Sequence, residues 1–253
     1  MRNDLPYNVA LRPVREGARD AMVDDAAGIE TRLAGAGQPA SPLGDAPAAP
    51  AGPAIDRSAY RQAFEDVYAG PGWGGTSGPG SSPVASVDYR LFLERFIARN
   101  NIRSIVDVGC GDWQFSRYVN FGRAEYLGID VVPHLVERNQ ATYGRETVRF
   151  ALAPEDPARL PKADLLLMKD VLQHLPDEEI RYYRFRVVPR YRFALLTNSF
   201  TKVQMKPKHN TDVAPGRFRT VDLRAEPYKF KGAYVSEYWT EAWERIQTLL
   251  VIN

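Results

Sequence analysis

The chain has 253 residues, of which 44% are hydrophobic and 25% charged. That length is enough to bury a core in one substantial domain that carries an extension. The composition is ordinary for a soluble globular protein, and no run of about 18 apolar residues predicts a membrane span. The net charge of +2, spread without a long basic block, argues against a dedicated nucleic-acid-binding protein.

The chain contains a single cysteine, Cys110. One cysteine cannot form an internal disulfide and cannot by itself make a thiolate metal site, so we expect no metal centre. Residues 1–20 contain no apolar segment of the secretory kind, and we therefore expect a cytoplasmic protein.

The N-terminal part of the chain differs in composition from the rest. Residues 34–55 are dominated by Ala, Pro and Gly with one charge, which predicts a linker that buries little apolar area. A helix is conceivable over residues 20–33, but it has no convincing apolar face. We expect residues 1–55 to form an extension and residues 56–253 to form a single folded domain.

Two helices are predicted within residues 56–101, where they would serve as lid or docking helices. The first begins at a candidate cap, Asp56 or Ser58, and the second ends near Asn101. Their apolar residues recur at helical spacing: Tyr60, Phe64, Val67 and Tyr68 in the first, and Tyr89, Phe92, Leu93, Phe96 and Ile97 in the second. The Gly- and Pro-rich segment 70–83 between them excludes regular structure but offers Trp73 and backbone N–H groups to a ligand.

After these helices, short apolar runs of strand length alternate with helical segments. The runs are residues 104–109, 124–130, 148–153, 163–169 and 192–198, and residues 233–239 and 245–252 follow as two closing strands. This alternation predicts an α/β fold of the Rossmann-like, doubly wound class. We expect a mainly parallel seven-stranded sheet that ends in a C-terminal antiparallel hairpin.

The first predicted strand leads directly into Asp107, Gly109 and Gly111, before a helix that we expect to start near Trp113. Glycines at this point let a ligand approach the backbone at the carboxyl end of the strand, where open α/β sheets bind ligands. Asp130 ends the second strand about 20 residues later, the position from which a carboxylate accepts hydrogen bonds from ribose hydroxyls.

These segments resemble the motifs of class I S-adenosylmethionine-dependent methyltransferases. IVDVGCGDWQFS is similar to their first motif, YLGID to their second, and DLLLMKDVLQHLP to their fourth strand and following loop. The resemblance spans residues 56–253 and is greatest to a little-characterised bacterial group with WGG, SGPGS, GCGDWQFS and KDVLQHL blocks. It implies S-adenosyl-L-methionine as the cofactor.

The resemblance also assigns roles to individual residues. Gly109 and Gly111 would contact the amino-acid part of the cofactor, Asp107 would organise the turn or meet the ammonium group, and Asp130 would hold the ribose. Trp113 stands where the family motif usually has a third glycine, so the turn should open differently from a dinucleotide site. The predicted cofactor-binding set is Asp107, Gly109, Cys110, Gly111, Trp113 and Asp130, with Trp73 from the lid and Glu155 or Asp156 at the adenine.

Methyl transfer from a sulfonium is an in-line displacement, so the protein mainly aligns the acceptor and removes a proton where the nucleophile carries one. Lys169, Asp170, Gln173 and His174 follow the fourth strand, beside the cofactor in this fold. His174 is the candidate base, with Asp170 and Lys169 as further catalytic candidates. The alternatives are a structural His174 in the turn before Pro176 and a local ion pair between Lys169 and Asp170.

The acceptor pocket is expected from the segment after the fifth strand. The candidate acceptor-binding residues are Gln173, Asn198, His209, Asn210 and Asp212, and the alternative for the last three is a solvated loop. An Asn/Asp-Pro-Pro-Tyr/Phe block is missing after the fourth strand, which disfavours amino methylation of adenine, cytosine or glutamine. We interpret the arginines between 181 and 192 as the solvated face of a helix rather than an RNA contact.

Three hypotheses for function remain open at this stage. The first is methyl transfer to oxygen or nitrogen of a small polar metabolite, such as a sugar, an amino acid or a natural-product intermediate. The second is an enzyme for which the cofactor itself is the substrate, through cyclisation that releases methylthioadenosine. The third is a noncatalytic cofactor-binding module.

Overall fold

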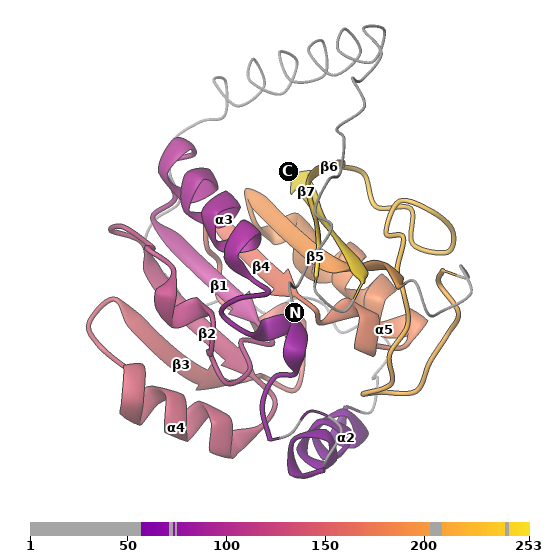
Figure 1. The fold of residues 1–253 in the computed structure, drawn as a ribbon, viewed down its shortest axis with the longest axis horizontal. Helices are drawn as coiled ribbons and strands as arrows, with labels where there is room; N and C mark the ends of the chain where they lie inside the picture. The colour runs from indigo at the N-terminus through magenta and orange to yellow at the C-terminus, as the bar shows by residue number, and fades with distance from the viewer. Residues whose placement is uncertain (1–56, 71–72, 74, 203–208, 241–242) are drawn as a thin grey trace, which may run out of the picture. The chain divides into compact units, whose positions relative to one another are not determined.

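The computed structural model describes residues 57–70, 73, 75–202, 209–240 and 243–253. Within them a single sheet has the strand order β3-β2-β1-β4-β5-β7-β6 (Figure 1). The strands are β1 (Ser104–Val108), β2 (Glu125–Asp130), β3 (Val148–Leu152), β4 (Leu165–Lys169), β5 (Phe193–Lys202), β6 (Ala233–Trp239) and β7 (Glu244–Ile252). The predicted extension over residues 1–55 and the candidate cap Asp56 lie outside the described residues.

Strands β1 to β5 are parallel, whereas β7 pairs antiparallel with both β5 and β6. Every residue of β1 and of β4 is buried. This explains why both segments are mainly apolar, because helices cover a parallel strand on both faces. The predicted mainly parallel, Rossmann-like sheet with a C-terminal antiparallel pair is confirmed.

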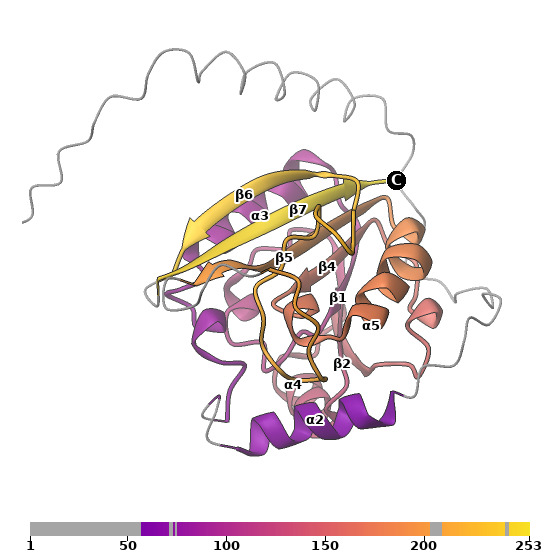
Figure 2. The same cartoon turned by 90° about the vertical axis from the view of Figure 1, so that its right-hand side faces the viewer.

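Four α-helices accompany the described part of the sheet: α2 (Ser58–Ala69), α3 (Val87–Arg99), α4 (Pro133–Tyr143) and α5 (Asp177–Tyr182). Helices α3 and α5 lie on opposite faces of the sheet (Figures 1 and 2). The predicted apolar face of α3 is buried, and its Phe96 packs edge-on against Phe193 of β5 at a ring-centroid distance of 5.5 Å. Helix α2 lies below the ends of the parallel strands (Figure 2).

The structure corrects two predictions of local structure. No α-helix starts near Trp113, because that residue has a φ of +58°, outside the helical region; the chain forms only a 3₁₀ turn at Ser116–Tyr118 before β2. The segment 70–83, expected to lack regular structure, contains a 3₁₀ turn at Pro79–Ser81. Strand β5 also continues to Lys202, which pairs with Glu244 of β7.

The helix after β4 is shorter than its apolar pattern suggests. Helix α5 ends at Tyr182 and continues as a π-helical turn over Tyr183–Val187 and a 3₁₀ turn over Val188–Arg190. The four apolar residues predicted to face the sheet are all buried: Ile180, Tyr183, Val187 and Val188. Among the described residues, no helix is long and apolar enough to cross a bilayer.

Leu166 tests the central packing of the sheet because it is fully buried in β4. We expect Leu166→Ala to lower the free energy of unfolding by about 2–5 kcal/mol, through lost apolar burial and the cavity that remains. Leu91→Ala on α3, where the side chain is 49% exposed, should stay within about 0.5 kcal/mol of the unmodified protein. Denaturant titration measures both values, and equal transition midpoints would contradict the placement of Leu166.

Candidate active site

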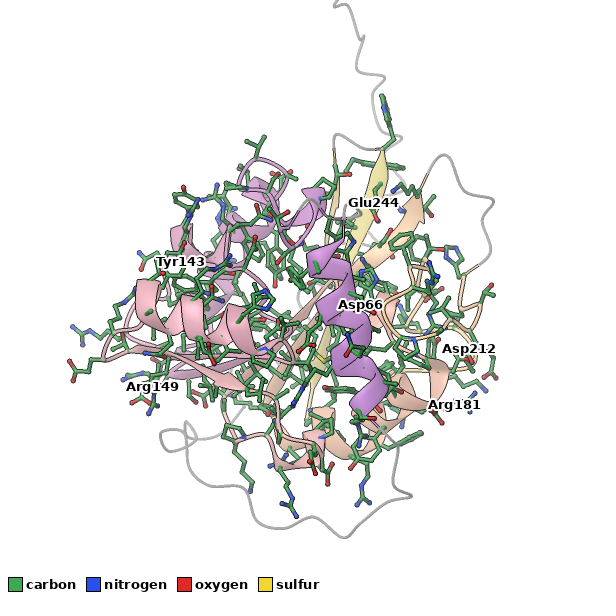
Figure 3. All side chains as sticks on the ribbon, turned by 90° about the horizontal axis from the view of Figure 1, so that it is seen from below. Asp66, Tyr143, Arg149, Arg181, Asp212 and Glu244 are labelled. Atoms are coloured by element: carbon green, nitrogen blue, oxygen red, sulfur yellow. The ribbon has the colours of Figure 1, made fainter. Side chains whose placement is uncertain are left out.

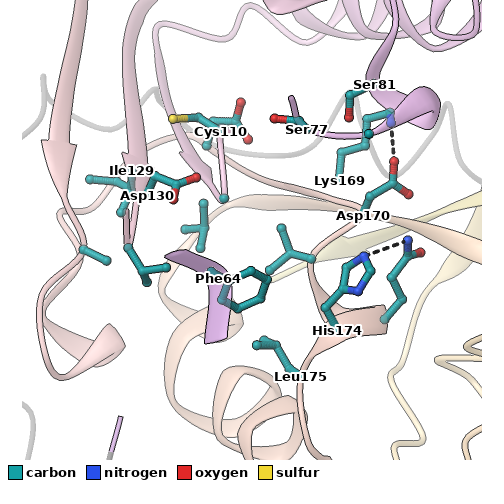
Figure 4. Close-up of a pocket in the computed structure, with 18 of the residues that line it drawn as sticks. Phe64, Ser77, Ser81, Cys110, Ile129, Asp130, Lys169, Asp170, His174 and Leu175 are labelled. Carbon is teal, nitrogen blue, oxygen red and sulfur yellow. Dashed lines mark hydrogen bonds and ion pairs between the residues drawn. The ribbon is translucent and has the colours of Figure 1, made fainter. Parts of the chain in front are cut away.

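A cavity of about 840 Å³ lies at the carboxyl ends of β1, β2 and β4 (Figure 4). Strand β1 lies between β2 and β4, so the chain reverses its direction of winding here, and open α/β sheets bind ligands at such a point. Helix α2 lines the cavity with Tyr60, Phe64 and Tyr68. Seen from below in Figure 3, α2 lies across the middle of the view, between the α4 side and the α5 side.

The turn after β1, residues 109–113, is here called the glycine turn. Gly109 has a φ of +72° and Gly111 a φ of +57°, values that side-chain-bearing residues rarely adopt. A Cβ atom on Gly109 would lie 2.4 Å from Val171 Cγ2, and one on Gly111 would lie 2.2 Å from Ser77 Oγ. Both positions therefore require glycine, for backbone conformation and for space.

Trp113 keeps the left-handed backbone that a third glycine would adopt. Such a conformation costs a residue other than glycine roughly 1–3 kcal/mol, and only surrounding structure can maintain it. Here the indole is 2% exposed and packs among the rings of Phe121, Tyr126, Tyr143 and Phe150. Trp113 thus adds side-chain packing at this position, while its backbone keeps the left-handed conformation typical of glycine.

The N–H groups of the glycine turn already have partners within the protein. Those of Gly109 and Cys110 donate to Ile129 O at 2.8 and 3.1 Å, and that of Gly111 donates to Asp130 Oδ2 at 2.8 Å. Dinucleotide sites instead place free N–H groups at a helix N-terminus against a pyrophosphate. This turn has neither the free donors nor the helix, so it does not suit a phosphate.

Asp130 closes the glycine turn in addition to lining the cavity. Its Oδ1 accepts a hydrogen bond from Val132 N at 3.1 Å, while Oδ2 is held by Gly111. Burial raises the pKa of Asp130, and these backbone donors oppose the rise. Each carboxylate oxygen has a second lone pair, so the group can still accept a hydrogen bond from a ligand hydroxyl.

A contact at Ser77 joins the loop after α2 to the glycine turn. Ser77 Oγ lies 2.8 Å from Tyr68 OH and accepts a hydrogen bond from Asp112 N at 2.8 Å, while Ser77 N donates to Asp112 Oδ2 at 3.2 Å. Trp73, in the same loop, packs against His174 with ring centroids 5.2 Å apart. Sequence reasoning missed Ser77 and Asp112, for which the SGPGS and GCGDWQFS blocks were the only signal.

The other end of α2 is held by an ion pair. Arg57 Nε donates to Glu179 Oε1 on α5 at 2.9 Å, and the side chains are only 17% and 4% exposed. The guanidinium group also lies 4.5 Å from the ring centroid of Tyr182. Burial raises the pKa of Glu179, and the contact with Arg57 opposes the rise. Sequence reasoning missed this pair, which joins residues 122 positions apart.

At the end of β4, Lys169 and Asp170 form an ion pair, the alternative that the sequence offers for these two residues (Figure 4). Lys169 Nζ also donates to Gly80 O at 3.2 Å. Asp170 has a φ of +58°, and its Oδ1 is buried without a hydrogen-bond partner. Both residues line the cavity, so the pair brings nearly balanced charge and one unpartnered acceptor to its wall.

The hydrogen bonds around His174 determine which ring nitrogen carries its proton. Gln173 Oε1 accepts from Ser199 N at 2.7 Å, so the Gln173 amide nitrogen faces His174 Nε2, at 3.4 Å. Nδ1 lies 3.3 Å from Arg217 O, which can only accept. Nδ1 therefore carries the proton and Nε2 the lone pair. Burial lowers the pKa of His174, which keeps the ring neutral at pH 7.

The structure divides the remaining predicted residues. Trp73, Asp107, Cys110, Glu155 and Gln173 line the cavity. Asp156 does not line it; its Oδ1 accepts hydrogen bonds from Ala158 N at 2.9 Å and from Tyr182 OH at 2.5 Å. Asn198 Oδ1 accepts from Gln173 N at 3.2 Å, so Asn198 supports Gln173 from β5 instead of lining the cavity.

The three candidates from the loop after β5 lie outside the cavity. His209 stacks on Phe200 at a centroid distance of 4.5 Å. The Asn210 amide is bonded to Asp222 and Glu226 within the loop, and Asp212 Oδ1 accepts from Asp177 N at the start of α5. The polar atoms of Asn210 and Asp212 thus hold the loop, whereas His209 Nδ1 is buried without a hydrogen-bond partner. The cavity wall on this side consists of Lys202, Phe218, Glu244 and Ile246.

Residues 106–183 match a family model described as a methyltransferase domain. Among solved structures, the N-methyltransferase NodS from Bradyrhizobium japonicum WM9, in complex with S-adenosyl-L-homocysteine, is 15% identical, with a TM-score of 0.52; the match covers 78% of this chain and 99% of NodS. The 1,6-didemethyltoxoflavin-N1-methyltransferase from Burkholderia thailandensis is 15% identical, with a TM-score of 0.51, covering 83% and 94%. These likenesses show the fold. No curated protein sequence matches.

The matched segment contains the glycine turn, Asp130 and the loop after β4. This match and the fold define an S-adenosylmethionine-dependent transferase with the Rossmann-like fold of class I methyltransferases. S-adenosyl-L-methionine is its cofactor. The described residues fit this group, because Asp107 and Asp130 line the cavity and the N–H groups of the glycine turn are bonded within the protein, so this turn has none free for a pyrophosphate. The predicted enzyme class and cofactor are confirmed, and the roles of individual residues stay predictions.

Gly109 tests the close packing of the glycine turn, and Gly122 provides a matched control. Both glycines have positive φ, but a Cβ on Gly122 would meet nothing within 4 Å. We expect each alanine variant to lose about 1–2 kcal/mol of stability from backbone strain, and Gly109→Ala to lose roughly 1–3 kcal/mol more from the contact with Val171. Thermal and denaturant unfolding measure the difference. Equal losses in the two variants would contradict the packing described.

Proposed function

We propose that the protein transfers the methyl group of S-adenosylmethionine to oxygen or nitrogen of a small polar metabolite, such as a sugar, an amino acid or a natural-product intermediate. One observation carries the proposal: a neutral imidazole, His174, lies in the same cavity as the two strand-end carboxyl groups of Asp107 and Asp130. A general base therefore accompanies the groups suited to the cofactor.

Residues on the β1 and β2 side would hold the cofactor, which when bound supplies a methyl group on a positively charged sulfur. Asp130 would accept hydrogen bonds from the ribose, and Gly109 and Cys110 would contact the amino-acid part. The predicted contact from Gly111 is not supported, because Gly111 does not line the cavity and its N–H donates to Asp130 Oδ2. Glu155 is favoured over Asp156 at the adenine because only Glu155 lines the cavity. Trp73 would cover the methionine end of the cofactor and exclude water, since its loop is joined to the glycine turn through Ser77.

The β4 and β5 side would hold the acceptor. His174 Nε2 would take a proton from a hydroxyl or ammonium nucleophile once the Gln173 amide gives way to it. Asp170 Oδ1 is a second acceptor for such a proton donor, while Lys169 offsets its charge. Lys202 and Glu244 on the wall support a polar acceptor. The Burkholderia thailandensis neighbour has 1,6-didemethyltoxoflavin bound together with S-adenosylhomocysteine, so this fold accommodates an acceptor beside the cofactor product.

The product formed from the cofactor tests the proposal against its two alternatives. We expect S-adenosylhomocysteine to accumulate only when a pool of polar small-molecule acceptors is supplied, as followed by mass spectrometry. Methylthioadenosine formed without any acceptor would instead establish cyclisation of the cofactor. Retained cofactor without turnover under every acceptor pool would indicate a noncatalytic binding module.

Mutation of His174 tests the proposed base. We expect His174→Ala to lower turnover by roughly 10²–10⁴-fold, the usual contribution of positioned proton transfer, with nearly unchanged cofactor affinity. Turnover of the unmodified enzyme should rise with pH through a value below 6.5 and then level off, because burial lowers the pKa of His174.

The matched control is His134→Ala, which removes an exposed histidine on α4 and should leave turnover unchanged. If His174 is only structural, its removal will lower thermal stability and cofactor affinity together. A stable, fully active His174→Ala variant would exclude both roles and point to Asp170.

A further inference from the structure

Three buried side chains form a hydrogen-bonded series beside the cavity. Trp113 Nε1 lies 3.0 Å from Tyr126 OH, and Tyr126 OH lies 2.6 Å from Asp107 Oδ2. Tyr126 is fully buried in β2, and Asp107, next to the glycine turn, is 7% exposed. The proposed function leaves Tyr126 without a role, and the sequence predicted Trp113 only as a member of the cofactor-binding turn.

The direction of both hydrogen bonds follows from the chemistry of the groups. An indole N–H can only donate, so the Tyr126 oxygen accepts from Trp113. The hydroxyl proton of Tyr126 is then directed to Asp107, whose Oδ2 acts as the acceptor. The series therefore favours the carboxylate form of Asp107 and holds that group in one orientation.

Other groups around Asp107 compete over its charge. Together they raise its pKa to about 7: burial is the largest cause, the hydrogen bond from Tyr126 opposes the rise, Asp130 at the end of β2 adds to it, and Lys169 on β4 opposes it. Tyr89 on α3 and Cys110 in the glycine turn also face the group. Asp107 is thus poised between its two protonation states near neutral pH, and loss of one donor would change the balance.

We propose that Tyr126 and Trp113 are positioning residues for the amino-acid end of the cofactor: they hold Asp107 as an ionised acceptor for the cofactor's ammonium group. This inference rests on the cofactor-binding part of the proposed function and is independent of the acceptor. It also explains why a bulky residue occupies a left-handed position, since a glycine at 113 would have no side-chain N–H to donate to Tyr126.

Tyr126→Phe tests the proposal, with two ligands that differ in the amino-acid end. S-adenosylhomocysteine carries the ammonium group, and methylthioadenosine has no amino-acid end. We expect Tyr126→Phe to weaken S-adenosylhomocysteine binding about tenfold or more, as for a lost hydrogen bond to a charged group, with unchanged methylthioadenosine affinity. Titration calorimetry measures both constants.

The control is Tyr143→Phe. Tyr143 packs on the same indole, with ring centroids 4.9 Å apart, but its hydroxyl accepts from Arg117 at 3.1 Å. It should bind both ligands as the unmodified protein does. Trp113→Phe, which keeps a ring but removes the N–H, should lose affinity for S-adenosylhomocysteine selectively and to a smaller extent.

The pH dependence provides a readout that a merely structural role would not change. An ionised Asp107 binds the ammonium group, so affinity for S-adenosylhomocysteine should fall as the pH falls through about 7. Tyr126→Phe removes a donor that stabilises the carboxylate, so the midpoint of this fall should move to higher pH. Methylthioadenosine affinity should show no such dependence in either protein.

Equal weakening of both ligands, or an unchanged affinity and midpoint for S-adenosylhomocysteine, would overturn the proposal. If the unmodified protein bound neither ligand, the cofactor assignment would fall and this inference with it. Selective weakening in a protein that shows no methyl transfer would support the inference while contradicting the proposed reaction.

Discussion

The active site depends on how the chain turns after β1. Asp130 at the end of β2 accepts the N–H of Gly111, and Ile129 accepts those of Gly109 and Cys110, so the turn is bonded to the neighbouring strand. Because its N–H groups are used internally, the turn offers no donors for an anion. It therefore suits the ammonium group at the amino-acid end of S-adenosylmethionine better than a pyrophosphate.

The same turn determines what can pack around it. Val171 and Ser77 occupy the space where side chains at Gly109 and Gly111 would lie. The loops after β4 and after α2 consequently pack directly against the backbone of the glycine turn. Helix α2 is held over the cavity by Ser77 at one end and by the buried pair of Arg57 and Glu179 at the other. Removal of one member would leave a buried charge unpaired, which is costly.

Burial has opposite consequences for the two groups given central roles. It lowers the pKa of His174 and raises that of Asp107, so in each case the neutral form is favoured. A neutral imidazole is the form that a general base requires. A neutral carboxylic acid would not suit an ammonium group, and the donors and cation beside Asp107 work against it. Desolvation thus keeps His174 in the form that its proposed role needs, whereas at Asp107 neighbouring groups oppose the effect of desolvation.

The sequence by itself determined where along the chain the strands lie, the apolar face of α3, the glycine turn and the acid that ends β2. These features depend on periodicity and on residues close in sequence, and the carboxyl ends of parallel strands meet by construction. The ion pair of Lys169 and Asp170 was foreseeable for the same reason, because the two residues are adjacent.

Only the tertiary structure decided which polar side chains reach the cavity. Asn210 and Asp212 have polar side chains suited to an acceptor, but these are hydrogen-bonded to Glu226 O and Asp177 N. Lys202 and Glu244 instead reach the cavity wall from the paired strands β5 and β7. Trp113 gained its partner Tyr126 only through packing against β2. Side-chain direction in a long loop and contacts between distant segments leave no periodic trace in a sequence, since they follow from how the elements pack.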